Sequence, residues 1–388
     1  MSRQLLFLPG PVSVAQPVLE ALGRPLIDHR GPDFAAMLER ITAALRPIFG
    51  TSGDLALLGS SGTGAMEAAL VNLFSPGDRL LSCAVGAFGK RFAAIATSYG
   101  CVVEMLETPL GAALDPRALQ ARLEADEQRT IAGVLLTANE TSTGVANDMA
   151  ALAPIVRAHG AVSLVDAISG LGASEFLMDR WGYDAVAAAS QKALAAPPGV
   201  AMIAISERAA KRLAGARIGR FYFDLARAIE SARLGQMPWT PPISILYALD
   251  VALQRYTAHG MNAAFVRHAR FAAAVRAGLE RLGFTLFSQP GAHSNTVVAA
   301  YPPNGIDPSA LLKKLREEYG VVLSGGQAEL AGKIVRFGTM GEIGETDLIG
   351  AIGAIELALI ELDAPVEAGC ATGAAIESLS GRVTSGVS

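Results

Sequence analysis

A chain of 388 residues is long enough for two or three domains, and its 51% hydrophobic content against 18% charged residues is ample for a large buried core. The net charge of −4 leaves no basic footprint for nucleic acid, and no apolar run reaches membrane-spanning length. Three widely spaced cysteines (Cys83, Cys101 and Cys370) form no disulfide framework or zinc pattern, and the first residues lack a signal-peptide pattern, so we expect a cytoplasmic protein.

Short apolar runs alternate with helix-like stretches between about residues 55 and 205. The expected strands are 55–58, 79–83, 102–106, 131–137, 162–166, 185–189 and 200–205. Helical patterns between them include 63–73 and 149–159, the second closed by Gly160. This α/β alternation predicts a mainly parallel, doubly wound sheet, in which ligands bind beyond the carboxyl ends of the strands.

The pattern changes after the proline-rich segment 238–242. A long helical region, about 243–282, precedes a second set of α/β elements at 296–300, 311–319, 321–323 and 334–338. We therefore expect a large domain over residues 21–255 and a smaller C-terminal α/β domain over 256–365, with residues 1–20 joining the small domain. Beyond 366 the chain is rich in Ala, Gly, Ser and Thr, which predicts a mobile tail over 366–388.

The glycine-rich loop Gly59-Ser-Ser-Gly-Thr-Gly64 follows an expected strand and opens an expected helix. Free N–H groups and the helix dipole at such a start favour a phosphate, and Ser61 and Thr63 would add hydroxyl donors. A tight turn that simply needs glycine explains this loop alone equally well. No Gly-Lys-Ser/Thr follows, so the loop is not a Walker motif.

Asp166 and Lys192 each follow a short apolar run, and both fall at the same expected edge of the sheet. A lysine in a pocket can form a Schiff base, and an aspartate can keep a pyridine nitrogen protonated, which are the two needs of pyridoxal phosphate (PLP). Singly, Asp166 is more simply a turn or cap residue and Lys192 a solvated loop lysine. Together they are stronger evidence, with Gln191 and Ser190 as further phosphate donors.

Other candidates have simpler alternatives. Phe88 lies between glycines, where it could stack on a planar ring or anchor a loop. The polar run 137–144 could line a site or merely connect two elements. Arg336, in an apolar run, could bind a carboxylate, form a structural ion pair or face water. The histidines show no metal-ligand spacing, although His29-Arg30 could lie near a site entrance.

With these motifs the chain resembles the class V, fold-type I PLP-dependent aminotransferases, and most of all their alanine–glyoxylate and serine–glyoxylate group. The resemblance runs from Leu8-Pro-Gly-Pro11 to about Glu361. Its most specific motifs are Ser61-Gly-Thr-Gly-Ala-Met-Glu67, Asn139-Glu-Thr-Ser-Thr-Gly-Val145, Asp166-Ala-Ile-Ser-Gly-Leu-Gly172, Ser190-Gln-Lys-Ala-Leu194 with Pro197-Pro-Gly199, and Val335-Arg-Phe-Gly338. It implies the fold-type I architecture and a homodimer with active sites at the interface.

The resemblance implies a role for each matching position. Lys192 would be the Schiff-base lysine and proton carrier, and Asp166 would pair with the ring nitrogen. Arg336 would take the substrate carboxylate, with Gly10 close by. The other implied cofactor contacts are Ser61, Gly62, Thr63 and Gln191 at the phosphate, Phe88 and Ile168 on the two ring faces, Thr141 near the ring hydroxyl, and Thr240 at the partner subunit's phosphate. The chain departs from the family at Phe88, where some relatives have Trp or Tyr, and at Ala138-Asn139, where His-Gly or His-Cys is more usual.

The resemblance therefore predicts transamination between a small amino acid, alanine or serine first, and a 2-oxo acid, glyoxylate or pyruvate. Aspartate, ureidoglycine and aminoethylphosphonate are donors for other members of the family. A cysteine desulfurase-type lyase would share the fold but needs a nucleophilic cysteine over the cofactor, and none of the three cysteines is well placed. A non-catalytic relative is a further alternative, which the intact set of Asp166, Lys192 and Arg336 disfavours.

Overall fold

Seven strands form the larger of the sheets, in the order β2-β10-β9-β8-β5-β3-β4. They are β2 (Asp54–Leu58), β3 (Arg79–Ala84), β4 (Val102–Glu107), β5 (Ile131–Thr137), β8 (Val162–Asp166), β9 (Ala185–Ala189) and β10 (Ala201–Ile205). The computed structural model, which describes residues 4–381, shows neighbouring strands parallel except at β10. Strand β10 runs antiparallel to both β2 and β9, a direction that its apolar sequence does not reveal.

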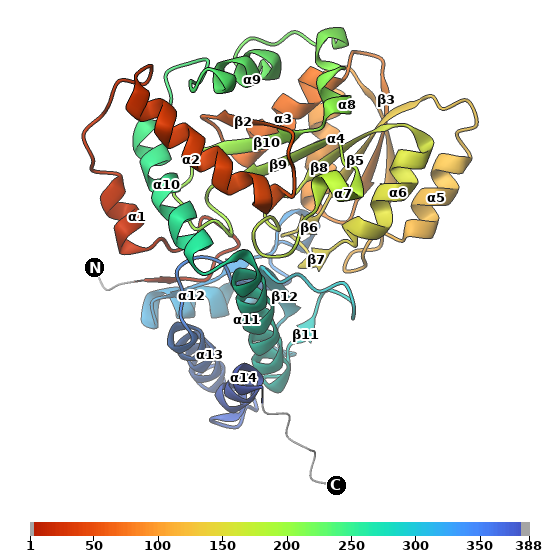
Figure 1. Cartoon of the computed structure of the whole chain (residues 1–388). Helices are drawn as coiled ribbons and strands as arrows, with labels where there is room; N and C mark the ends of the chain where they lie inside the picture. Colours follow the sequence, from red (N-terminus) through yellow and green to blue (C-terminus); the bar gives the residue numbers. More distant parts are fainter. Residues whose placement is uncertain (1–3, 382–388) are drawn as a thin grey trace.

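Helices cover both faces of this sheet, as Figure 1 shows. One face packs against α1 (Gln16–Ala21), α2 (Pro32–Phe49), α5 (Pro116–Glu124), α6 (Met149–His159), α7 (Met178–Trp181) and α10 (Ile243–Ala258). The other packs against α3 (Gly62–Leu73), α4 (Ala87–Ser98), α8 (Glu207–Ala210), the short η1 (Leu213–Gly215) and α9 (Leu225–Arg233). Because both faces are buried, central strands such as β9 and β10 are apolar at every position.

A second, antiparallel sheet has the order β11-β12-β15-β14 and lies below the large one in Figure 1. Its strands are β11 (Thr285–Leu286), β12 (Val297–Tyr301), β14 (Ser324–Gly325) and β15 (Val335–Gly338). Helices α11 (Met261–Arg281), α12 (Pro308–Glu318) and α13 (Glu345–Ile360) share a hydrophobic core with this sheet, and η2 (Ala328–Leu330) lies beside the sheet. Near the N-terminus, β1 (Leu5–Leu6) pairs with β13 (Val321–Val322). A short hairpin, β6 (Asn139–Glu140) with β7 (Val145–Ala146), completes the strands described.

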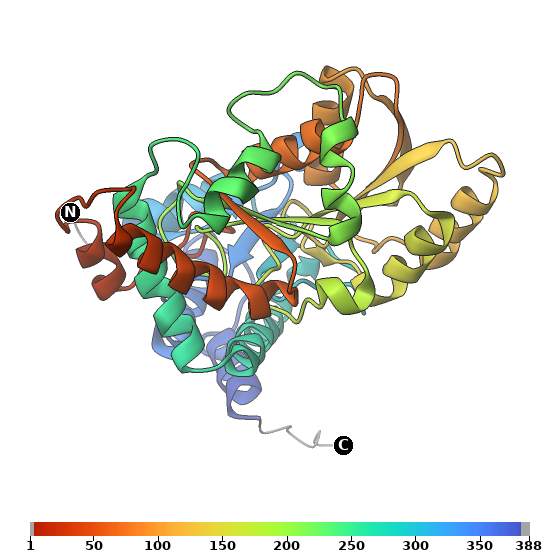
Figure 2. The ribbon, with the colours of Figure 1, turned by 45° about the horizontal axis from the view of Figure 1, so that its top comes forward.

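The expected long helical region is two helices, because the chain turns at Gly260, whose φ of +79° is a left-handed conformation that suits glycine. Helix α10 packs on the large sheet and α11 on the small one. Figure 2 shows the ribbon from a second direction, with α2 and α10 side by side on the same face of the large sheet. Within residues 4–381, no helix combines the length and apolar character needed to cross a membrane.

The mobile tail expected beyond residue 366 does not begin there, because residues 370–380 form helix α14 (Cys370–Ser380). Ala371, Ala375 and Leu379 share one face of that helix and are buried in the core of the small domain. The buried carboxylate of Glu356, on α13, accepts hydrogen bonds from the N–H groups of Ala371 and Thr372 at 3.0 and 3.3 Å. The many small residues of this segment did not reveal that it docks on the small domain. The rest of the expected tail, residues 382–388, lies outside the described residues. The boundary expected at residue 255 stays a prediction.

Candidate active site

A pocket of about 190 Å³ lies beyond the carboxyl ends of β8 and β9. It is lined by Ser61, Gly62, Thr63, Phe88, Arg91, Asn139, Thr141, Asp166, Ile168, Ser169, Gln191 and Lys192. All but Arg91, Asn139 and Ser169 are residues to which the sequence gave a site role. They converge because parallel strands bring the loops that follow them to one edge of the sheet.

One end of the pocket is the start of helix α3. Ser61 is the N-cap, yet its side chain makes no capping bond, and neither its hydroxyl nor that of Thr63 has a partner among residues 4–381. The first turn therefore presents free N–H groups and two uncommitted hydroxyls, a set of donors suited to an anion. Gly62 allows close packing here, since a Cβ on it would lie 2.6 Å from Cδ1 of Ile168.

Asp166 ends β8 and is only 3% exposed. Its carboxylate accepts one hydrogen bond within the described chain, from the N–H of Ile168 at 2.9 Å. Burial raises the pKa of Asp166 to about 7, and the charge of Glu140 adds to the rise, while Lys192 and Arg91 oppose it. A cation placed beside this carboxylate would stabilise its charged form.

Lys192 lies in the turn after β9, where its Nζ donates a hydrogen bond to the carbonyl of Pro9. Gly10 makes room for it, because a Cβ at this position would lie 2.5 Å from Nζ. Burial lowers the pKa of Lys192 to about 8, with Arg336 and Arg91 adding to the fall and Asp166 opposing it. The neutral, nucleophilic form of the amine is therefore much more accessible near neutral pH than that of an ordinary lysine.

Phe88 is held at the pocket by the start of helix α4. The buried carboxylate of Glu140 accepts hydrogen bonds from the N–H groups of Phe88 and Gly89 at 3.0 and 3.2 Å. The guanidinium carbon of Arg91 lies 4.5 Å from the centroid of the Phe88 ring, a cation–π contact. The sequence pointed to Phe88 but not to Glu140 or Arg91; the only signal for Glu140 was its place in the polar run 137–144.

Arg336 lies on β15 of the small domain and is 5% exposed. Its Nε donates to the carbonyl of Gly325 at 2.7 Å and its Nη1 to that of Thr141 at 3.0 Å. No carboxylate lies within ion-pair distance of it in residues 4–381, and its Nη2 has no hydrogen-bond partner there. Burial lowers the pKa of Arg336 to about 10, while Glu140 opposes the fall. The arrangement is that of a guanidinium held by carbonyls with donors to spare for an anion.

Some of the sequence's candidates lie elsewhere. Thr240 is exposed and, with Gly59 and Tyr222, borders a separate small hollow rather than the pocket. Arg30 donates to the side-chain carbonyl of Gln236, and neither His29 nor Arg30 lines the pocket. Within residues 4–381, no group of three or more His, Cys, Asp or Glu side chains is placed to hold a metal ion.

Comparison with known proteins identifies the family. The model of the class V aminotransferase family matches residues 20–339. The chain belongs to the class V aminotransferases. It is 36% identical to the small subunit of a soluble hydrogenase of Synechococcus sp., over 93% of this chain and 94% of that protein. It is 34% identical to serine–glyoxylate aminotransferase of Arabidopsis thaliana, over 96% of this chain and 94% of that protein.

Among solved structures, ureidoglycine–glyoxylate aminotransferase of Bacillus subtilis matches with a TM-score of 0.92 at 29% identity, covering 98% of this chain and 99% of that one. The family assignment and the fold-type I architecture that the motifs predicted are thereby confirmed. A class V aminotransferase is PLP-dependent, so this chain is a PLP-dependent enzyme.

The residues of the pocket fit this cofactor. The uncommitted donors at the start of α3 suit the phosphate of PLP. The carboxylate of Asp166, which accepts only one hydrogen bond from the described residues, suits a cationic ring nitrogen. The side-chain Oε1 of Gln191 is buried without a hydrogen-bond partner among the described residues, as expected of an amide that is completed by a bound group.

Proposed function

We propose that this class V aminotransferase transfers an amino group between a small amino acid, alanine or serine first, and a 2-oxo acid, glyoxylate or pyruvate. The observation that carries the proposal is the convergence of the Lys192 amine and the Asp166 carboxylate in one pocket whose wall is held by Arg336. An amine, a ring-nitrogen partner and a carboxylate receptor are the three groups that the reaction requires.

Each residue has a defined task in this proposal. When bound, PLP supplies an aldehyde for the donor's amino group and an electron sink for the carbanion at Cα. Ser61, Gly62, Thr63 and Gln191 would hold its phosphate, Phe88 and Ile168 its ring faces, and Thr141 the region of its ring hydroxyl.

Asp166 keeps the ring nitrogen protonated in this scheme. The Nζ of Lys192 removes the proton from Cα and returns it. Arg336 orients the α-carboxylate, with Gly10 leaving space beside Lys192.

The charge of the site bears on the donor. Arg91 lines the same pocket and has no acidic partner within residues 4–381, which favours a second candidate, a donor with another acidic group such as aspartate. The Synechococcus relative is named as a hydrogenase subunit, but the pocket of this chain presents groups suited to amino-group transfer.

A cysteine desulfurase has less support. None of the three cysteines lines the pocket. Cys83 is buried in β3, and burial raises the pKa of its thiol; burial also raises the pKa of Cys101, to about 11. Cys370 lies at the start of α14 in the small domain. These three free thiols also support the proposed cytoplasmic location.

We also propose a homodimer with active sites at the interface. The rings of Phe221 and Trp239 stack with centroids 4.8 Å apart beside Tyr222, and Phe221 and Tyr222 are 70% and 47% exposed. An exposed aromatic cluster of this kind is typical of an interaction surface. Thr240 follows Trp239 directly, so in the dimer it would reach the partner's phosphate. The mass of the protein in solution tests whether the dimer forms.

A matrix of amino donors against 2-oxo acids on purified protein tests the proposed reaction. Wild-type protein should convert alanine or serine with glyoxylate or pyruvate into the matching products. Lys192→Ala should lose at least about 10²–10⁴-fold in rate, the contribution of a positioned proton carrier, together with the visible absorbance of the lysine-bound cofactor. A Lys192→Ala protein with full activity would exclude the proposed role.

A further inference from the structure

Asn139 is a buried side chain, 7% exposed, on the wall of the pocket, and its amide bonds to both domains. Its Nδ2 donates to the hydroxyl of Ser169 at 2.8 Å, within the large domain. The same nitrogen donates to the hydroxyl of Thr296 at 3.0 Å, and Oδ1 accepts from the hydroxyl of Ser294 at 2.6 Å. Both donors of the amide are therefore used, one for each domain.

The small-domain partners of Asn139 connect directly to the strand of Arg336. Ser294 and Thr296 lie just before β12, which pairs with β15 so that Ala299 is opposite Arg336. The carbonyl of Thr296 also accepts a hydrogen bond from the N–H of Thr339, the residue after β15, at 3.0 Å. A shift of the segment 294–296 would therefore be transmitted to β15.

The segment that carries Asn139 contacts the small domain at a second point nearby. Arg336 donates through Nη1 to the carbonyl of Thr141, two residues after Asn139. The segment 139–141 thus contacts the small domain both through the Asn139 amide and through the guanidinium itself. Space is tight around the first contact, since a Cβ on Gly170 would lie 3.0 Å from Cβ of Asn139.

We propose that Asn139 is a positioning residue that fixes the Arg336-bearing sheet against the cofactor pocket. It thereby sets the place where the substrate α-carboxylate is held. The inference rests on the proposed transamination and names a determinant of it that acts through Arg336. An asparagine suits the task because the two donors and the acceptor of its amide bond the hydroxyls on the two sides at once.

The test compares Asn139→Ala with a matched buried asparagine. Asn72 is fully buried, its Nδ2 donating to the carbonyls of Ala68 and Phe223 and its Oδ1 accepting from the N–H of Leu225, all within the large domain. Asn139→Ala should raise KM for alanine and for glyoxylate roughly tenfold, the effect of losing buried hydrogen bonds, with a smaller change in kcat. Asn72→Ala should lower stability without altering KM.

A donor without a carboxylate separates positioning of Arg336 from general damage. Half-reaction rates with a simple primary amine should be reduced little by Asn139→Ala, whereas those with alanine should fall. Combining Asn139→Ala with Arg336→Lys should then be less than additive. Ser294→Ala leaves both Nδ2 contacts of Asn139 in place and removes the Oδ1 contact, together with the bonds that the Ser294 hydroxyl makes to Thr296 and to the N–H of Val297. It should give a weaker version of the same pattern, which covers the case in which Asn139→Ala fails to fold.

Hydrogen exchange of the apoprotein gives a readout without activity. Exchange should rise in peptides covering 294–301 and 335–338 in Asn139→Ala, but not in Asn72→Ala. Equal losses with alanine and with the amine, weaker PLP binding, or a changed cofactor spectrum would show that Asn139 acts on the cofactor instead, and would overturn the inference. Wild-type protein inactive with every amino acid would instead refute the proposed function.

Discussion

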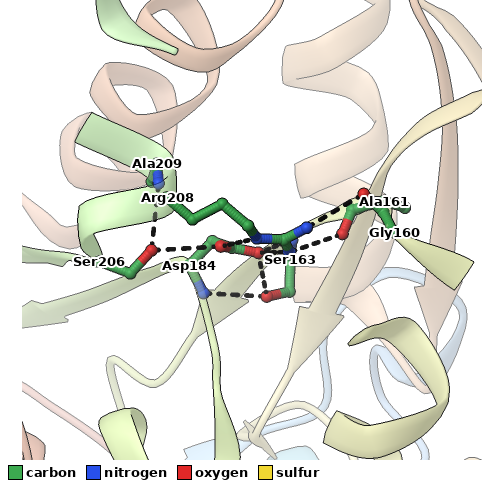
Figure 3. Close-up of polar contacts among 7 residues, drawn as sticks. All are labelled: Gly160, Ala161, Ser163, Asp184, Ser206, Arg208 and Ala209. Carbon is green, nitrogen blue, oxygen red and sulfur yellow. Dashed lines mark hydrogen bonds and ion pairs between the residues drawn. The ribbon is translucent and has the colours of Figure 1, made fainter. Parts of the chain in front are cut away.

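Two buried aspartates, at opposite ends of neighbouring strands, differ in how fully the chain satisfies them. Asp184, just before β9, accepts hydrogen bonds from the N–H and hydroxyl of Ser163 at 2.8 and 2.9 Å, from the Ser206 hydroxyl at 3.2 Å, and from Nε of Arg208 at 2.7 Å (Figure 3). A second nitrogen of Arg208 completes the ion pair. Asp166, at the end of β8, accepts one hydrogen bond, from the N–H of Ile168.

The contrast separates a carboxylate of the fold from one left for a ligand. Arg208 also donates to the carbonyls of Gly160 and Ala161, so the Asp184 cluster joins the starts of β8 and β9 to the end of β10. Nothing in that cluster is left over for a ligand. Asp166 has unused electron pairs, a raised pKa and a position on a pocket, which together are typical of a functional site.

The largest stability effect should come from Asp184→Ala. The change leaves the buried N–H of Ser163 and the Arg208 guanidinium without their acceptor, and we expect a loss of about 3–5 kcal/mol in the free energy of unfolding. Urea unfolding of the apoprotein measures it. The folded fraction should keep wild-type kcat/KM; a loss below about 1 kcal/mol would show that the cluster is not a stabilising one.

Asp166→Asn should have the opposite profile. The neutral amide cannot stabilise a cationic ring nitrogen, so kcat/KM for alanine and glyoxylate should fall on the order of 10²–10³-fold, as for other lost electrostatic contacts to the reacting group. The unfolding free energy of the apoprotein at neutral pH should not fall, because a poorly satisfied carboxylate has been removed. A stability loss as large as that of Asp184→Ala would remove the distinction between the two residues.

The sequence predicted most of the large sheet and the Asp166–Lys192 pair, because apolar strand periodicity and the convergence of strand ends are local signals. The direction of β10, the docking of α14 and the small-domain contacts of Asn139 depend on partners distant in the chain. Glu140 was missed for the same reason, since its role arises only where helix α4 meets the hairpin β6–β7. Arg91 packs on Phe88 within α4 itself, and its place on the pocket follows from how α4 is set against the sheet. Thr240 lies outside the pocket of its own chain and is explained only by the proposed partner subunit.

Asp166 should make the apoprotein lose stability as pH rises from about 4 to about 7, while His268, whose pKa burial lowers to about 4, acts in the opposite direction. The pKa of Asp166 is raised from 3.8 to about 7, so in this window the folded state holds a proton that the unfolded state has released. The stability that Asp166 contributes is fully present below its pKa in the unfolded state. It falls by about 1 kcal/mol per pH unit as the pH rises from there through its pKa in the folded state. Urea unfolding across this range measures the slope.

Two comparisons isolate Asp166 as the source of that slope. Asp166→Asn should remove this component of the slope, and saturating PLP should reduce it, because a cation at the carboxylate lowers its pKa. A slope equally steep in Asp166→Asn would assign the pH dependence to other groups.

The carboxylates of Asp184 and Asp166 differ both in the number of hydrogen-bond donors around them and in the presence of an ion-pair partner. A third buried carboxylate, that of Glu140, separates these two differences. Like Asp184 it is richly bonded, accepting from the N–H groups of Phe88 and Gly89 and from the N–H and hydroxyl of Ser142. Like Asp166 it has no ion-pair partner within residues 4–381, and burial raises its pKa. Of these three carboxylates, only that of Asp184 has a guanidinium partner, Arg208.

Glu140→Gln gives the smallest expected effect and the finest test. Removing the charge should lower the pKa of Asp166, so the pH at which apoprotein stability stops falling should move down by less than about one unit, since Glu140 contributes less than burial does. One lost acceptor at the start of α4 should cost about 1 kcal/mol. The double variant with Asp166→Asn should show no such movement. An unchanged midpoint in Glu140→Gln would mean that burial alone raises the pKa of Asp166. The absence of an ion-paired cation, rather than the presence of a second carboxylate, would then distinguish its surroundings from those of Asp184.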